Sequence, residues 1–171
     1  MKVILYAAIT ANGFIAKPDD NTDFVSSEEW DSYKQMVKKA GCIICGRRTY
    51  EEGLKSGTLL TQEGFHIVLT INPKLTSSDP RVMITTESPN EALKILEEKG
   101  FSEVIIGGGG KLNASFLQSG LVDEIYLDIE PHLFSAGIPV TYPFKSDLEL
   151  ELLETKPLSP QTIQLHYRVQ K

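Results

Sequence analysis

The sequence of 171 residues has few cysteines and lacks a long hydrophobic run. Its two cysteines, Cys42 and Cys45, neither require nor suggest an oxidising compartment. No apolar run approaches the roughly 18 residues of a membrane span, and the start of the chain has the pattern of a strand rather than of a signal peptide. We therefore expect a cytoplasmic protein with no membrane partner.

The sequence also lacks an excess of basic residues. Its 17 Lys and Arg stand against 23 Asp and Glu, which gives a formal net charge of -6. Nucleic acids are bound by dense basic patches, so we expect no nucleic-acid partner. The hydrophobic fraction of 41% and the charged fraction of 23% are typical of globular proteins. The length predicts a single domain over residues 1–171.

The two cysteines are spaced as a CxxC pair between Gly41 and Gly46. Two β-branched residues between them favour a buried strand, on which positions i and i+3 face opposite sides. Thiols on opposite sides cannot hold one metal ion, and no histidine lies nearby to complete a zinc site. We predict two core cysteines and no metal site.

Strand-like and helix-like patterns alternate through the first two thirds of the chain, and the last three strands have no helix between them. This order predicts an α/β fold with a mostly parallel sheet of about eight strands, an antiparallel C-terminal edge and helices on both faces. Helices are predicted over 27–39, 89–99 and 111–117, with a shorter one after Arg48, and strands over 3–9, 42–45, 66–70, 81–84, 103–106, 124–129, 149–155 and 162–169.

A glycine cluster from Ile106 to Lys111 joins a buried strand to a helix. In such sheets ligands bind at the carboxyl ends of strands. Glycines let a phosphate approach the backbone, and the N–H groups at a helix start attract it. A turn alone needs one or two glycines, so we interpret the cluster as a pyrophosphate cradle. Its spacing fits neither a P-loop nor a Rossmann fingerprint.

A second strand end carries two arginines, in the run from Gly46 to Thr49 that begins a predicted helix. Arginine presents a planar fork of donors to a phosphate, which predicts a local anion site. A solvated surface pair is the alternative. A third strand end, at Leu69 and Thr70, offers a further hydroxyl group.

In order and spacing, these motifs resemble the dihydrofolate reductase fold. The resemblance covers nearly the whole chain and is carried by residues 6–16, 46–51, 69–73 and 106–110. The stretch Phe-Leu-Gln-Ser-Gly-Leu-Val-Asp-Glu over 116–124 is similar to one branch, the pyrimidine reductase domain of riboflavin biosynthesis and its stand-alone relatives. In the bifunctional enzyme that domain follows a zinc deaminase, whose His-x-Glu and Pro-Cys-x-x-Cys motifs are not in this sequence.

The resemblance implies an NADPH site and a cis peptide bond between Gly108 and Gly109. Ile71 stands where dihydrofolate reductases often have a second hydroxyl, so the preference for NADPH over NADH stays open. The implied cofactor-binding residues are Ala8, Asn12, Gly13, Phe14, Ile15, Gly46, Arg47, Arg48, Thr49, Leu69, Thr70, Ile106, Gly107, Gly108, Gly109, Gly110, Lys111 and Leu112.

Hydride transfer in this fold also requires a proton. Dihydrofolate reductases use an acidic residue on the first helix, and counting back from Gly46 places that position at Trp30. We interpret Glu29 as the capping-box partner of Ser26, which leaves Asp31 as the candidate catalytic acid. The candidate substrate-binding residues are Thr10, Trp30 and His132.

We predict an NADPH-dependent reductase that resembles the 5-amino-6-(5-phosphoribosylamino)uracil reductase and acts on a small pyrimidine. The missing carboxylate disfavours dihydrofolate, because a carboxylate pairs with the pteridine ring in that family. Two alternatives stay open: a dihydrofolate, pterin or other carbonyl or imine reductase of the same fold, and a non-catalytic NADPH-binding protein. The resemblance also implies a homodimer.

Overall fold

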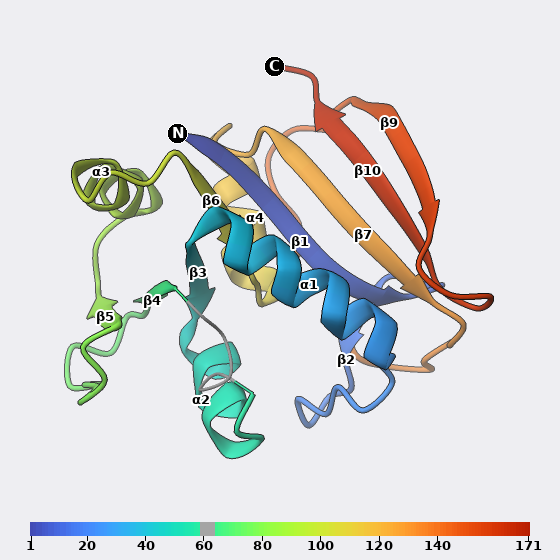
Figure 1. Cartoon of the computed structure of the whole chain (residues 1–171), viewed down its shortest axis with the longest axis horizontal. Helices are drawn as coiled ribbons and strands as arrows, with labels where there is room; N and C mark the ends of the chain where they lie inside the picture. The colour runs from blue at the N-terminus through green and yellow to red at the C-terminus, as the bar shows by residue number, and fades with distance from the viewer. Residues whose placement is uncertain (59–63) are drawn as a thin grey trace.

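The computed structural model describes residues 1–58 and 64–171. Figure 1 shows their arrangement around one large twisted sheet. The helices are α1 (Ser27–Ala40), α2 (Arg47–Lys55), α3 (Pro89–Glu98) and α4 (Gly110–Gln118). The strands are β1 (Lys2–Thr10), β2 (Phe14–Ala16), β3 (Cys42–Gly46), β4 (Phe65–Leu69), β5 (Val82–Thr85), β6 (Glu103–Ile106), β7 (Glu124–Glu130), β8 (Ile138–Pro139), β9 (Leu150–Pro157) and β10 (Ile163–Val169).

The large sheet within the described residues has eight strands in the order β5-β4-β3-β6-β1-β7-β10-β9. The pairs from β5 to β7 are parallel, whereas β10 pairs antiparallel with both β7 and β9. The predicted fold class, a mostly parallel sheet with an antiparallel C-terminal edge, is confirmed.

Helices cover both faces of the sheet. Successive residues of β1 point to opposite sides of it, so that neighbouring side chains of this strand meet different helices. Ile4 packs with Val37 of α1 on one face. Leu5 belongs to the core cluster of the other face, together with Leu96 of α3 and Phe116 of α4. None of the helices in the described ranges is long and apolar enough to cross a membrane.

The helix boundaries follow local side-chain chemistry. Helix α1 begins after Ser26, whose Oγ accepts a hydrogen bond from the Glu29 N–H at 3.2 Å, and ends at Gly41, which has a left-handed φ of 75°. Helix α3 begins in the same way after Ser88 and has Pro89 at its first position. These caps explain why the predicted starts agree with the structure.

Both cysteines lie in the core, as predicted. On β3, Cys42 packs in the cluster that includes α3 and α4, whereas Cys45 packs with Tyr50 of α2. Burial raises the pKa of each thiol to about 12. Within the described residues, no group of three or more His, Cys, Asp and Glu side chains is placed to hold a metal ion.

The short strands β2 and β8 form a separate antiparallel ribbon. Neither of them is among the strands predicted from the sequence, and the resemblance, which implies a loop from Asn12 to Ile15, is wrong for Phe14 and Ile15, which lie in β2. Strands of two and three residues are too short to show an alternation, and these two lie more than a hundred residues apart in the chain. The ribbon fixes the turn that follows β1, where the Val140 N–H donates to the Gly13 carbonyl at 2.9 Å.

Candidate active site

The carboxyl ends of β3 and β6 lie side by side and bring Gly46 against the glycine cluster. The Gly46 N–H donates to the Gly108 carbonyl at 2.7 Å. A Cβ on Gly46 would lie 3.8 Å from the Gly109 nitrogen, and one on Gly109 would lie 3.6 Å from Thr49 Oγ1. We call Gly46, Thr49, Gly108 and Gly109 the glycine cradle. Its surface is glycine backbone together with the Thr49 hydroxyl, and a side chain at Gly46 or Gly109 would lie against it.

Different physical constraints explain why glycines stand at the positions of this cluster. A Cβ on Gly107 would lie 2.7 Å from Ile43 Cδ1, and one on Gly110 would lie 2.3 Å from the Pro139 carbonyl oxygen. Gly108 has a φ of 85°, and its bond to Gly109 is cis, as the resemblance implies. The number of glycines is therefore explained largely by packing and backbone conformation, which corrects the argument that the surplus indicates a ligand.

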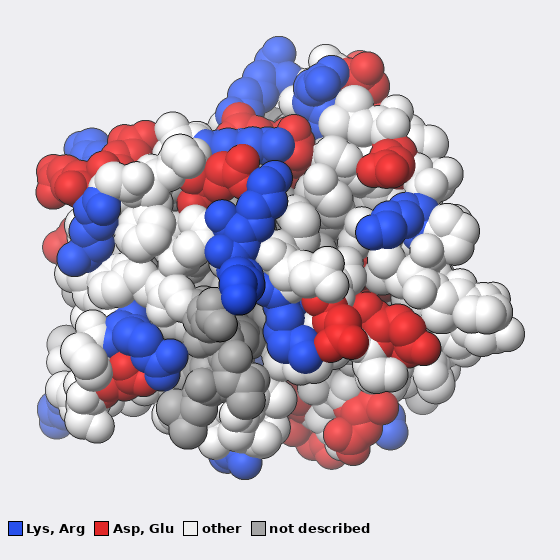
Figure 2. Space-filling model, in the orientation of Figure 1, with Lys and Arg blue, Asp and Glu red and all other residues white. Residues whose placement is uncertain are grey.

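The two arginines stand at the start of α2, beside the cradle, and each is paired with a carboxylate. Arg47 Nη1 donates to both carboxylate oxygens of Glu51, at 2.9 and 2.8 Å. Arg48 donates through Nε and Nη2 to Asp20 Oδ2, at 3.0 and 2.5 Å. On the face drawn in Figure 2, basic and acidic side chains are interspersed. Phosphate binding by Arg48 would compete with Asp20.

The end of β4 places the other predicted nucleotide contacts in a tight turn. Thr70 Oγ1 accepts a hydrogen bond from the Asn72 N–H at 3.0 Å, which leaves its own proton for donation. Leu69 is partly buried, and Ile71 is 100% exposed. Beyond the cradle, Ile106 is buried, Leu112 packs against the core, and the Lys111 ammonium lies 5.8 Å from the centre of the Tyr142 ring.

The turn after β1 is held by its own side chains. The buried Thr10 hydroxyl donates to Asn12 Oδ1 at 2.8 Å and accepts from the Phe14 N–H at 3.0 Å. Asn12 Nδ2 in turn donates to the Phe134 carbonyl at 2.7 Å. Thr10 and Asn12 thus fix the turn between β1 and β2.

The two aromatic candidates for substrate binding lie on different elements. Trp30 on α1 is partly buried, with its ring centre 5.4 Å from that of Tyr33. His132 is exposed in the loop after β7, and its ring packs edge-on against Phe24 at 6.0 Å. No contact in the described structure joins Trp30 to His132.

The buried carboxyl of α1 is Glu29, one residue before the position given by counting. Glu29 is 3% exposed, whereas the Asp31 side chain is 65% exposed and pairs with Lys34 at 2.6 Å. The capping box forms only in part, because the Ser26 N–H donates to Glu130 Oε1 at 2.9 Å rather than to Glu29. Glu29 is therefore free of the structural role that the sequence suggested.

Glu29 faces two carboxyls on β7, Asp128 and Glu130, which are 0% and 2% exposed. Burial, and then the charges of Asp128 and Glu130, raise the pKa of Glu29 to about 8. Burial is also the main reason that the pKa of Asp128 is raised to about 6. Asp128 lies beside Ala8, which the resemblance implies as a cofactor-binding residue on β1. We call Glu29, Asp128 and Glu130 the carboxyl cluster.

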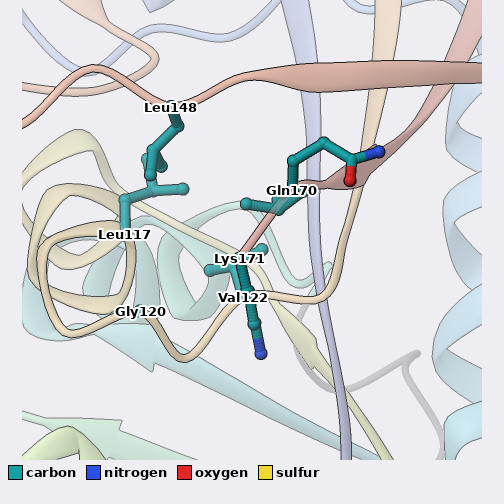
Figure 3. Close-up of a pocket in the computed structure, with 7 residues that line it drawn as sticks. Leu117, Gly120, Val122, Leu148, Gln170 and Lys171 are labelled. Carbon is teal, nitrogen blue, oxygen red and sulfur yellow. The ribbon is translucent and has the colours of Figure 1, made fainter.

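A separate pocket lies at the other end of the sheet, where β7 and β9 begin (Figure 3). Its walls are mainly hydrocarbon, from α4, the turn before β7 and the end of the chain. The one amino group there, Lys171 Nζ, pairs with Asp123 at 2.6 Å. The pocket offers no group suited to hydride or proton transfer. Its lining residues are Leu117, Gly120, Val122, Leu148, Val169, Gln170 and Lys171.

Residues 1–164 match the family model of the RibD C-terminal domain. The chain belongs to the RibD C-terminal domain family. This RibD C-terminal domain protein is 28% identical to the uncharacterized protein YwjB of Bacillus subtilis, over 97% of both chains. It is 22% identical to the uncharacterized protein YyaP of the same organism, over 97% of this chain and 94% of YyaP.

Solved structures share the fold at low sequence identity. A Shewanella sp. PV-4 protein, provisionally assigned to riboflavin biosynthesis, superposes over 100% of both chains with a TM-score of 0.86 and 20% identity. RibD of Acinetobacter baumannii gives a TM-score of 0.81 at 17% identity, over 99% of this chain and 58% of RibD.

A bifunctional Thermotoga maritima protein contains the same fold in a longer chain. It is a diaminohydroxyphosphoribosylaminopyrimidine deaminase/5-amino-6-(5-phosphoribosylamino)uracil reductase. It gives a TM-score of 0.78 at 17% identity, over 98% of this chain and 56% of the Thermotoga chain. The RibD C-terminal domain is the reductase part of a riboflavin biosynthesis enzyme, which indicates an oxidoreductase-like role for this family member.

Proposed function

We propose that this RibD C-terminal domain protein is an NADPH-dependent reductase of a small phosphoribosylamino-pyrimidine. The observation that carries the proposal is the placement of two features along the carboxyl ends of adjacent strands. The glycine cradle and its arginines lie at β3 and β6, and the protonatable Glu29 lies over β1 and β7. The first suits a dinucleotide phosphate and the second suits proton donation.

The cradle suits the pyrophosphate of NADPH, because glycine backbone and the Thr49 hydroxyl line it and helix α4 begins at Gly110, directly after it. When bound, the cofactor supplies a hydride from its nicotinamide ring. We propose that the other nucleotide contacts come from the start of α2, the end of β4 and the turn after β1. These residues are Arg47, Arg48, Thr49, Leu69, Thr70, Ala8, Asn12, Gly13, Phe14 and Ile15.

The reduction adds a hydride to carbon and a proton to a heteroatom. In a phosphoribosylamino-pyrimidine, a C–H bond forms at the ribose carbon attached to nitrogen, the ring C–O bond breaks, and the proton goes to the ring oxygen. Glu29 retains its proton near neutral pH, and Asp31 lies on the exposed surface. We therefore propose Glu29 as the acid in place of Asp31.

The same observation favours a second candidate function, reduction of dihydrofolate or another pterin. The sequence argument against dihydrofolate rested on a missing carboxylate on the first helix. Glu29 supplies a buried carboxyl there. A missing carboxylate would also favour a non-catalytic NADPH-binding protein, so the buried Glu29 weakens that alternative as well.

The proposal is tested by following NADPH oxidation with the phosphoribosylamino-pyrimidine and with dihydrofolate in parallel. We expect oxidation with the pyrimidine, a loss of about 100-fold or more in Glu29→Gln, and near-normal rates in Asp31→Asn. Oxidation with dihydrofolate alone would select the second candidate function. Tight NADPH binding without oxidation of either mixture would refute both reductase functions.

We also propose that the protein is a homodimer. Leu150 and Leu152 on β9 and Ile163 on β10 are large exposed apolar side chains. Figure 1 shows β9 and β10 extending beyond the helices. An exposed apolar face on a sheet edge is typical of an interface, and a two-fold axis would pair it with the same face of a second copy.

A further inference from the structure

One buried oxygen of the carboxyl cluster requires a hydrogen-bond donor. Asp128 Oδ2 accepts from the Tyr6 hydroxyl at 2.5 Å, but Asp128 Oδ1 is buried and accepts from none of the described residues. Glu130 differs, because Ser26 and Thr162 donate to both of its carboxylate oxygens. An unsatisfied buried acceptor is rare and costly, most of all when it is charged. Asp128 is therefore the member of the cluster that lacks a donor.

Glu29 is the group placed to supply that donor. Its side chain is buried on α1 one turn before Ser32, whose Oγ lies 3.0 Å from the Tyr6 hydroxyl that bonds Asp128. Among the charges around Glu29, Asp128 acts on it most strongly. None of the ion pairs among the described residues includes Glu29, Asp128 or Glu130. Two ionised carboxylates would repel each other here, whereas one shared proton removes the repulsion and satisfies Oδ1.

We propose that Glu29 and Asp128 share one proton, which Glu29 donates to Asp128 Oδ1, and that Asp128 is a positioning residue that keeps Glu29 in its acid form. The reactive role of this proton rests on the proposed function, in which Glu29 protonates the substrate. After each turnover the Glu29 carboxylate takes a proton from solvent, and Asp128 stays ionised throughout.

The surroundings of the pair place the proton on Glu29. The Tyr6 hydroxyl from β1, the Gln164 amide from β10 and the Lys156 ammonium from β9 all stabilise the charge of Asp128. Glu130 of β7 opposes both charges, and so it raises the pKa of each carboxyl. Burial raises the pKa of both carboxyls, but hydrogen bonding and a nearby ammonium oppose that rise at Asp128 and not at Glu29.

Two tyrosines and a glutamine complete the shell around the pair. Burial raises the pKa of Tyr6 and of Tyr33 above the usual range, so both phenols stay neutral. Gln164 Nε2 of β10 donates to the Tyr6 oxygen at 3.1 Å and to Ser32 Oγ at 3.2 Å. The Tyr6 proton is thereby directed to Asp128, which holds that carboxylate ionised and oriented.

The pH dependence of turnover tests the positioning role. Activity falls on the alkaline side as Glu29 loses its proton. Asp128→Asn removes the neighbouring charge and keeps an acceptor for Tyr6, so we expect the alkaline limb of kcat to move down by about one pH unit or more. Glu124→Gln on the same strand is the matched control, because its carboxylate pairs with Lys2 and His166. An unchanged limb in Asp128→Asn would overturn the proposal.

Infrared spectroscopy tests the shared proton without any substrate. A protonated carboxyl has a C=O stretch that an ionised carboxylate lacks. We expect this band in the wild type at pH 7, its loss in Glu29→Gln, and its titration at lower pH in Asp128→Asn. Absence of the band in the wild type at pH 7 overturns the shared proton, even if substrate is reduced. The expected band behaviour without turnover of any substrate supports the shared proton and refutes the proposed function.

Discussion

At the residue scale, a carboxyl that keeps its proton in the fold makes stability depend on pH. The pKa of Glu29 is about 8 in the folded protein against an ordinary value of 4.5. Between these two values the unfolded chain has lost the proton and the folded chain still holds it. Stability therefore falls as pH rises from about 4.5 to about 8. Asp128 acts in the same direction, from 3.8 to about 6.

Replacing Glu29 by glutamine removes this penalty. We expect Glu29→Gln to melt above the wild type at pH 8, by at least the roughly 2–4 °C that 1 kcal/mol gives in a chain of this size, and to show little difference at pH 5. Thermal unfolding followed by circular dichroism at the two pH values measures the effect. Asp31→Asn on the exposed side of α1 is the control. A difference that is the same at both pH values would contradict the prediction.

Asp20 forms an ion pair with the guanidinium group of Arg48, the group that would bind a phosphate. The contact is on the surface and so is worth at most about 1 kcal/mol. If Arg48 binds the 2′-phosphate, Asp20→Asn should tighten NADPH binding by about two- to five-fold and leave NADH binding unchanged. Asparagine suits the left-handed φ of 69° at this position.

Fluorescence titration with each cofactor measures this preference. Asp19→Asn is the matched control, because Asp19 is the adjacent acidic residue and forms no ion pair in the described structure. Equal tightening of both cofactors by Asp20→Asn would show that Arg48 does not distinguish them. Weaker NADPH binding would show that Asp20 orients Arg48 rather than competing for it.

Counting along the sequence places the acidic position of the first helix at Trp30, one residue after the buried Glu29. The predicted capping box between Ser26 and Glu29 forms only in part, because the Ser26 N–H donates to Glu130 instead. Ser and Glu three positions apart predict a capping box from local spacing alone. The competing acceptor, Glu130, lies 104 residues from Ser26 and reaches it only because α1 packs over the end of β7. The glycines and arginines were easier to find, because their chemistry depends on neighbours in the chain.

At the element scale, Gly46 and Gly110 each stand at the start of a helix and before a basic residue, but a side chain at the two positions would have different effects. A Cβ at Gly46 would meet only ordinary contacts, at 3.7 and 3.8 Å, whereas a Cβ at Gly110 would lie 2.3 Å from the Pro139 carbonyl oxygen. We expect Gly110→Ala to destabilise the fold by about 1–3 kcal/mol through overpacking. Gly46→Ala should unfold like the wild type and bind NADPH at least about ten-fold more weakly, because its methyl group covers the cradle.

Chemical denaturation and cofactor titration of both variants separate these two effects. Normal NADPH binding in Gly46→Ala would remove the glycine cradle from the proposed cofactor site. Normal stability in Gly110→Ala would show that the Ile138–Pro139 ribbon moves aside at little cost.

Most elements could be predicted because each contains its own signal. The serines before α1 and α3 and the β-branched run of β3 are visible locally. The ribbon of β2 and β8 has no local signal, since its pairing depends on the loop after β7 folding back to Gly13.

At the scale of the whole molecule, strand order is the feature that local patterns leave open. The absence of a helix after β7 predicts antiparallel neighbours. It does not predict that β10 inserts between β7 and β9 and leaves β9 at the edge. The edge strand β9 carries the exposed Leu150 and Leu152, which lie opposite Val169 and Tyr167 of β10.

If this edge joins two copies, one charge placed on it should separate them, because an isologous contact brings each substitution close to its own symmetry mate. We expect the wild type to have twice the chain mass of 19.0 kDa by light scattering after gel filtration, and Leu152→Glu to have the monomer mass with an unchanged circular dichroism spectrum. Ile71→Glu, at a fully exposed apolar residue after β4, is the matched control and should stay dimeric. A monomeric wild type would refute the homodimer, and a dimeric Leu152→Glu variant would move the interface to another face.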